Sequence, residues 1–165
     1  MDIKIEIATE LDNWNSKKKI NEKVISDITR NIINRYKNLK TIKEIELSIL
    51  LTDDKKMLSL NSEFRDVEKP TNVLSFPDLE INWRHLLELK PDADYMYLGD
   101  IAFGFETVKR EAEDKQINFE DHFKHLLVHG ILHLIGYDHI EDEDAEIMEA
   151  LEIEILNDYN IKSPY

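Results

Sequence analysis

The chain has 165 residues and no cysteine, and 42% of its residues are hydrophobic while 34% are charged. This length and composition predict one folded domain over residues 1–165 and exclude collagen-like and disordered classes. The lack of cysteine excludes disulfide bonds, thiolate metal sites and cysteine nucleophiles. Apolar runs are short and the first residues lack a signal-peptide pattern, so we expect a cytoplasmic protein with no membrane-spanning segment.

Charge is distributed unevenly along the chain, whose formal net charge is −14. Nine lysines and arginines lie between Trp14 and Lys43, whereas the segment from Glu141 to Tyr165 is strongly acidic. Two interpretations of the basic segment stay open: a solvated helix face, or a surface for an anionic partner. The acidic average makes the chain as a whole a poor electrostatic partner for nucleic acid.

The first half of the chain shows strand and helix periods in turn. Aliphatic residues alternate with polar ones over residues 3–7 and again over 45–51, which is typical of half-buried strands. Apolar residues recur every four positions over 20–36 and predict a long amphipathic helix. A short helix is expected to begin at residues 53–54, and a short strand closed by proline is expected over 73–77.

The middle of the chain is less regular. Residues 78–94 lack a clear period, and Pro91 and Asp92 indicate a loop. Residues 95–103 predict a long strand, in which Gly99 marks a bulge or a close approach of another backbone.

The last part of the chain predicts helices. We expect a short helix over residues 106–114, a longer one from Asn118 to about residue 135, and a final acidic helix from about Asp142. Gly136 suits a left-handed position that ends the second of these helices. The whole pattern predicts a single α+β domain, with a small mixed β-sheet packed with helices.

The most informative stretch is HGILHLIGYDH, residues 129–139. His129 and His133 are one helical turn apart on one face, with Cα atoms about 6 Å apart, so both imidazoles can reach one metal ion. Gly136 allows the chain to reverse, and His139 can then return as a third ligand. Three nitrogen ligands leave a tetrahedral zinc site open for a water molecule whose pKa falls toward neutrality. The pattern therefore predicts a metal-binding helix near the C-terminus that holds Zn²⁺.

A second histidine pair has the same spacing. His125 and His129 are also four residues apart, and the crowded histidines of this segment project toward one side of the helix. The glycine stop and His139 beyond it favour the pair His129 and His133.

The segment differs from helical zinc peptidases, which place a glutamate general base directly after the first ligand. That position holds Gly130 here, which argues against a peptidase. Asp138 and Asp100 are candidates for orienting an imidazole or accepting a proton. Either residue could equally be an ordinary turn or strand-end carboxylate.

A second segment, LNSEFRDVEKPTNVLSFP, carries Arg65 next to a loop that two prolines make rigid. The forked guanidinium of arginine suits bidentate binding of a phosphate and can stabilise charge that develops on a phosphoryl group. The alternative is an ordinary surface ion pair with Asp66 or Glu68.

These two segments, together with LGDIAF, resemble the YbeY family of bacterial metal-dependent endoribonucleases that mature ribosomal RNA. The order of the segments is also that of the family, and the resemblance spans about residues 44–157. The histidine and proline segments are highly specific, whereas the Gly-Asp-Ile strand alone would be weak.

The resemblance implies that His129, His133 and His139 bind one zinc ion, and that Arg65 and His129 take part in catalysis. It implies cleavage of single-stranded RNA, in maturation of the 3′ end of the small-subunit (16S) ribosomal RNA and in ribosome quality control. It also implies association with ribosomal proteins and a ribosome-assembly GTPase. Two alternatives stay open: a non-catalytic ribosome-assembly factor with a structural metal, and a metal hydrolase of another phosphoester.

Overall fold

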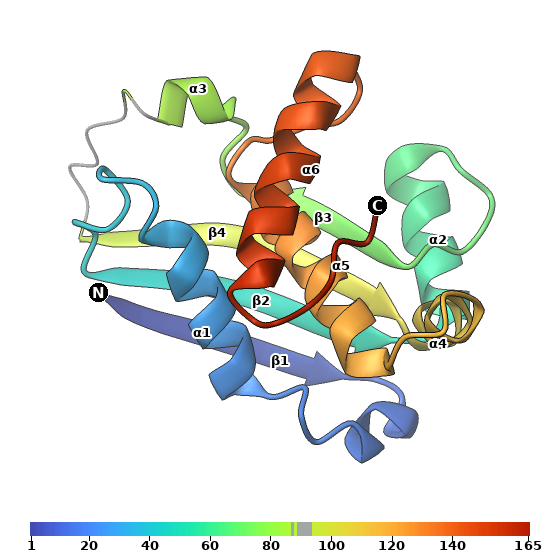
Figure 1. Ribbon diagram of the computed structural model, residues 1–165. Coiled ribbons are helices and arrows are strands. Elements are labelled where there is room, and N and C mark those ends of the chain that lie inside the picture. The colour runs from blue at the N-terminus through green and yellow to red at the C-terminus, as the bar shows by residue number, and fades with distance from the viewer. Residues whose placement is uncertain (87, 89–93) are drawn as a thin grey trace.

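A four-stranded mixed sheet lies at the centre of the computed structural model, which describes residues 1–86, 88 and 94–165 (Figure 1). The strands are β1 (Asp2–Thr9), β2 (Glu44–Thr52), β3 (Val73–Pro77) and β4 (Tyr95–Gly104). In the order β1-β2-β4-β3, the first three strands are parallel and the edge strand β3 is antiparallel to β4. The expected α+β fold with a small mixed sheet is confirmed.

Helices connect and flank the strands. They are the 3₁₀ helix η1 (Asp12–Ser16) and the α-helices α1 (Glu22–Ile33), α2 (Asp54–Arg65), α3 (Trp83–Leu86), α4 (Phe105–Asp114), α5 (Phe119–Leu134) and α6 (Asp142–Asn157). The side chains of Asn21, Asp53 and Asn118 cap α1, α2 and α5 by accepting a backbone N–H from the first turn. No helix within the described residues has both the length and the apolarity needed to cross a membrane.

The structure differs from the sequence-based expectation in two helices. The helix expected over residues 20–36 covers only Glu22–Ile33, because Asn21 caps its start and the chain continues in turns after its end. The irregular stretch after β3 contains the short helix α3, which sequence periodicity cannot detect at four residues. The loop expected at Pro91 and Asp92 lies outside the described residues.

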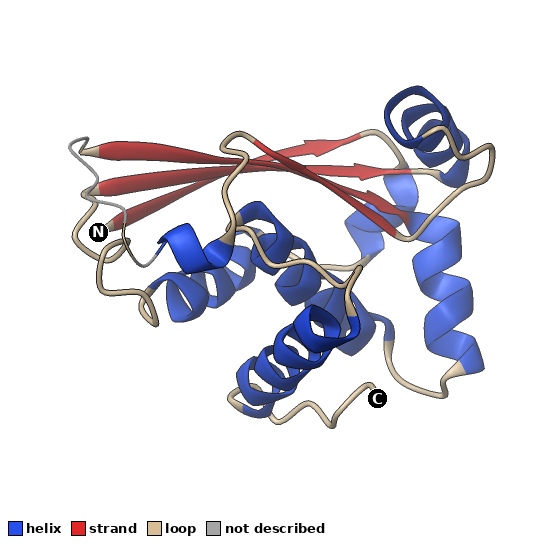
Figure 2. Cartoon of the chain, turned by 90° about the horizontal axis from the view of Figure 1, so that it is seen from above, coloured by secondary structure: helices blue, strands red, loops and turns tan. Residues whose placement is uncertain are grey.

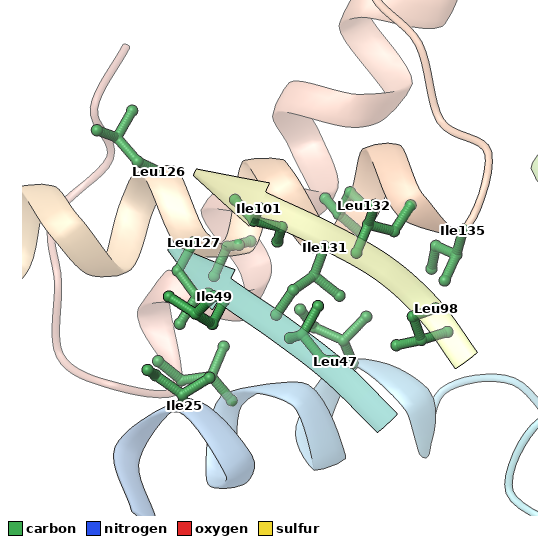
Figure 3. Packing of buried hydrophobic residues seen from close by; sticks show 14 of the residues in the cluster. Ile25, Leu47, Ile49, Leu98, Ile101, Leu126, Leu127, Ile131, Leu132 and Ile135 are labelled. Carbon is green, nitrogen blue, oxygen red and sulfur yellow. The ribbon is translucent and has the colours of Figure 1, made fainter. Parts of the chain in front are cut away.

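Helices cover the two faces of the sheet unequally. Most of them lie on one side, as Figure 2 shows from above. On this side Leu127 and Ile131 of α5 pack over Leu47 and Ile49 of β2 and Ile101 of β4 (Figure 3). Full burial of such aliphatic side chains stabilises the fold by about 1.5–3 kcal/mol each. This packing fixes α5, the helix that carries the histidines, against the sheet.

Helix α2 packs on the opposite face of the sheet, where Met57 contacts Leu74 and Ala102 in a smaller cluster. The chain leaves α2 through a loop and returns as the edge strand β3. The last turn of α2 therefore lies beside the edge of the sheet.

The bulge expected near Gly99 is present. Tyr97 and Gly99 pair with consecutive residues of β2, so Leu98 is the extra residue. Gly99 has φ +135°, and a Cβ atom there would lie 2.2 Å from the carbonyl oxygen of Phe76. Glycine is therefore required for β3 to approach β4 at this point.

The basic and acidic segments of the sequence meet in the fold. Arg35, just after α1, forms ion pairs with Glu154 and Asp158 at the end of α6, and Asn31 donates a hydrogen bond to Asp158. Arg30 donates to the backbone oxygen of Met1 at 2.7 Å. Part of the basic segment thus contacts the protein's own acidic helix, and an anionic partner for its exposed lysines stays a prediction.

Candidate metal centre

Helix α5 and the turn after it bring His129, His133 and His139 together. One ring nitrogen from each residue lies within 4.8 Å of the other two. The Nε2 atoms of His129 and His133 are 3.0 Å apart, and the His139 ring centroid lies 5.0–5.3 Å from those of the other two rings. The structure therefore groups the three histidines that the sequence predicts as ligands.

The turn after α5 is what returns His139 to the helix. Gly136 has φ +101°, and the backbone N–H groups of Gly136 and Tyr137 donate to the oxygens of His133 and Leu132. This pair of bonds is a Schellman motif, as expected for a glycine at this position. A Cβ atom at residue 136 would lie 2.2 Å from the oxygen of Ile81, so the neighbouring loop also requires glycine here.

The orientation of His133 is set by a backbone carbonyl. Its Nδ1 donates to the oxygen of Tyr137 at 2.9 Å, which leaves the lone pair on Nε2. Burial, together with the neighbouring rings of His129 and His139, lowers the pKa of His133 to about 4. The ring is therefore neutral at pH 7, the state in which imidazole binds a metal.

The orientation of His129 is set by Glu152 of α6, a residue that sequence reasoning missed. Nδ1 of His129 lies 2.7 Å from Oε1 of Glu152, and the Tyr165 hydroxyl donates to Oε2 at 2.5 Å. Complete burial of Glu152 by itself raises its pKa, but the nearby His125 ring and the hydrogen bonds from His129 and Tyr165 outweigh burial and lower the pKa to about 2. Because the carboxylate is ionised, it accepts the Nδ1–H of His129, and the lone pair of the neutral ring is then on Nε2.

These two tautomers test whether a metal ion fits the group. When both rings are neutral, the two Nε2 lone pairs face each other at 3.0 Å. Two lone pairs at this distance repel each other unless a cation binds both. Bonds of about 2.0–2.1 Å in a tetrahedral zinc site place neighbouring nitrogens about 3.3 Å apart, close to the spacing seen. The donor set therefore fits a divalent transition metal such as zinc.

The other candidates from the sequence have different places. His125 lies outside the group of three, with its Nε2 3.7 Å from Glu152 and 3.4 Å from the Tyr165 hydroxyl. The hydrogen bond that the structure shows for Asp138 is not to an imidazole: one carboxylate oxygen accepts the backbone N–H of His139 at 2.7 Å.

Asp100 is not part of the site. Its carboxylate accepts a hydrogen bond from the Tyr97 hydroxyl, and the Ser48 hydroxyl lies 2.9 Å from the same Tyr97 oxygen. The next residue, Ile101, faces α5, where it lies against Gly130. Since successive side chains of a strand point to opposite faces, Asp100 is on the face away from the histidines.

Gly130 itself is explained by packing. A Cβ atom there would lie 3.0 Å from Ile101 and 3.2 Å from the Ser75 hydroxyl. The position that carries the glutamate base in helical zinc peptidases thus faces the sheet in this fold.

Arg65 lies in the same cleft as the histidines. The cleft has a volume of about 590 Å³, and its wall is formed by Arg65, Val73, Leu74, Ser75, Pro77, Ile81, His129, His133, Gly136, Tyr137, Asp138, His139 and Ile140. The Arg65 guanidinium donates to the backbone oxygens of Ser75 at 2.9 Å and Phe64 at 3.0 Å. Among the described residues no carboxylate forms an ion pair with Arg65, so the expected alternative of a surface ion pair does not hold.

We expect His133→Ala to lose bound metal, whereas His125→Ala on the same helix keeps it. The first change removes one of three converging lone pairs, and the second removes a residue outside the group. Elemental analysis of the two purified variants measures the difference. Loss of metal from the His125 variant would contradict the assignment.

We expect Glu152→Gln to weaken zinc binding about 10- to 100-fold, because the neutral amide no longer stabilises the orientation and basicity of His129. Competition with a chromophoric chelator measures the affinity. Glu146→Gln, an exposed change on the same helix, serves as the control. Equal affinities for the two variants would show that Glu152 has no role in the site.

Comparison with known proteins places the chain in a family. A profile described as endoribonuclease YbeY matches residues 10–160. The endoribonuclease YbeY of Bradyrhizobium diazoefficiens is 51% identical over 126 residues, which cover 75% of this chain and 66% of the relative. The solution structure of TM1509 from Thermotoga maritima superposes with a TM-score of 0.51 at 23% identity, covering 96% of this chain and 91% of that one, and shows the same fold. The chain belongs to the YbeY endoribonuclease family.

Proposed function

We propose that this protein is a zinc-dependent endoribonuclease that cleaves single-stranded RNA. Its role would be maturation of the 3′ end of 16S ribosomal RNA and ribosome quality control, in association with ribosomal proteins and a ribosome-assembly GTPase. Membership of the family supports the reaction class. The observation that carries the proposal is the convergence of three imidazole nitrogens on a cleft that also contains Arg65.

His129, His133 and His139 would hold the ion through one nitrogen each. When bound, a divalent metal in such a site polarises a phosphate oxygen and lowers the pKa of a water molecule. Glu152 and the Tyr137 carbonyl keep two of the rings in the tautomer that this binding requires. His129 would thus serve both as a ligand and as part of the catalytic group.

Arg65 would bind the phosphoryl group that is attacked. Its two backbone contacts hold the guanidinium in place and leave other N–H groups for a ligand. A fixed positive charge stabilises the negative charge that grows on the phosphoryl oxygens in the transition state.

Asp138 is our candidate for the proton acceptor. It is the one carboxylate among the described residues that line the cleft. One of its oxygens accepts the backbone N–H of His139, which fixes the side chain beside a ligand. The second oxygen can then take a proton from the attacking water.

A set of three protein ligands leaves one coordination position of a tetrahedral metal free, which favours an enzyme over an assembly factor with a structural metal. Structural zinc sites usually have four protein ligands. Within the described residues the group comprises three histidines, and it faces a cleft. A metal hydrolase of another phosphoester would have the same centre and is separated from an RNase only by its substrate.

We expect the purified zinc-loaded protein to cleave a fluorescent single-stranded RNA, and a chelator to abolish cleavage until zinc is restored. A duplex of the same sequence and a small-subunit RNA fragment with a 3′ extension test the finer proposal. Unfolding by the chelator without any cleavage beforehand would support a structural metal instead. Hydrolysis of a small phosphodiester without RNA cleavage would favour the other hydrolase.

We expect Arg65→Ala to keep its metal and fold but to lower kcat for RNA cleavage about 100-fold or more, as loss of one fixed transition-state donor does elsewhere. Arg110→Ala, which removes an exposed arginine on α4, is the control. Circular dichroism and metal analysis confirm that both variants are intact. Equal cleavage rates for the Arg65 variant and the parent protein would remove this residue from the mechanism.

A further inference from the structure

An aromatic pair lies directly beside Arg65, outside the cleft wall described above. Phe64 is 52% exposed in the last turn of α2, and its ring packs edge-on against Phe76 of the edge strand β3 at 5.4 Å. The Arg65 guanidinium lies over the Phe76 ring at 5.1 Å. Phe64, Phe76 and Arg65 thus form one continuous surface that leads from the cleft around the sheet edge.

Hydrogen bonds hold the end of α2 and the loop that follows this surface in one conformation. Asp66 ends α2 in a left-handed conformation with φ 55°, and the backbone N–H of Val67 donates to the Asn61 oxygen at 3.2 Å. The side chain of Asn61, only 6% exposed, donates to the Lys69 oxygen at 2.9 Å. This hydrogen bond connects α2 to the loop that follows it. Because its support is fixed, the exposed face of Phe64 needs little ordering on binding.

The charged residues around the aromatic pair provide little net attraction for RNA. The whole chain carries −14, and Glu63, Asp66 and Glu68 are exposed around the aromatic pair. A phosphate backbone is repelled by such a surface, apart from Arg65 and Lys69. Contacts that do not depend on charge must therefore contribute, and stacking of bases on aromatic rings is the usual one for single strands.

We propose that the exposed face of Phe64 stacks an unpaired base of the RNA next to the phosphate that Arg65 holds. The proposal rests on the endoribonuclease function given above and adds a base-binding subsite to it. A base within a duplex already has its faces covered by its neighbours, so the subsite selects single-stranded RNA. Stacking on a bare ring tolerates any base, which gives affinity without strong sequence preference.

Substitution of Phe64 in the zinc-loaded full chain tests the subsite. Phe64→Leu keeps an apolar contact with Phe76 but removes the aromatic face, and we expect it to raise KM for a single-stranded RNA roughly tenfold with little change in kcat. Phe64→Trp keeps an aromatic face, so its KM is equal to or lower than that of the parent protein. Leu58→Ala removes an exposed apolar residue (42% exposed) from another face of α2 and leaves KM unchanged.

A series of oligonucleotides, each with one abasic nucleotide near the cleaved bond, locates the stacked base. At one position the abasic nucleotide raises the KM of the parent protein about tenfold. The KM of Phe64→Leu does not rise further on that substrate, because the base and the ring act as one pair. Binding gives a second readout. Single-stranded RNA quenches more tryptophan fluorescence in the Phe64→Trp variant than in the parent, whose signal comes from Trp14 and Trp83.

The outcomes separate the subsite from the proposed function. If the parent cleaves RNA and Phe64→Leu has the same KM, the subsite is wrong and the nuclease stands. An equal rise in KM for Leu58→Ala also overturns the subsite. So does a KM of Phe64→Leu that stays above that of the parent protein on every abasic substrate. A parent protein that neither binds nor cleaves RNA overturns both proposals.

Discussion

The hydrogen bonds on Nδ1 of His129 and His133 determine what the cleft can bind. An imidazole has two nitrogens, and the partner of one decides which lone pair faces the ligand. Glu152 takes Nδ1 of His129 and the Tyr137 carbonyl takes Nδ1 of His133, so both Nε2 atoms face each other. With the opposite tautomers the same rings at the same positions would offer N–H groups and repel a cation. The metal chemistry of the fold therefore depends on two contacts outside the ligand set.

The fold holds the three rings with unequal rigidity. His129 and His133 are on α5, which is buried along most of its length and approaches the sheet closely at Gly130. His139 is exposed and follows a turn, and its position depends on the left-handed Gly136 and on the stacking of Trp83 over Tyr137 at 5.0 Å. Two ligands thus form a preorganised pair, and the third closes the site from a less constrained segment.

How much could be predicted from the sequence depended on whether the signal was local. Strand alternation and the spacing of His129 and His133 are local, so the sheet, α5 and the histidine group were predictable. The role of Glu152 was not, because α6 carries many acidic residues and only packing against α5 shows which one is buried. Asp100 failed as a candidate for the same reason, since its face of β4 depends on the sheet. The ion pairs between Arg35 and the end of α6 likewise join segments more than 100 residues apart, so local sequence patterns do not predict them.

The acidic net charge is compatible with an RNA substrate, because exposed charges act only over a short distance in salt. At physiological ionic strength, exposed charges are screened beyond about 8–10 Å. Acidic residues elsewhere, such as those of α6 that pair with Arg35, therefore act weakly inside the cleft, while the surface as a whole offers RNA no net attraction. There a divalent cation held by neutral imidazoles and the Arg65 guanidinium would provide local positive charge. A protein built in this way would not draw in RNA from a distance. Under the proposed function it would rely on contacts made after encounter, which would favour short single-stranded segments that enter the cleft over duplexes that bind through their charge.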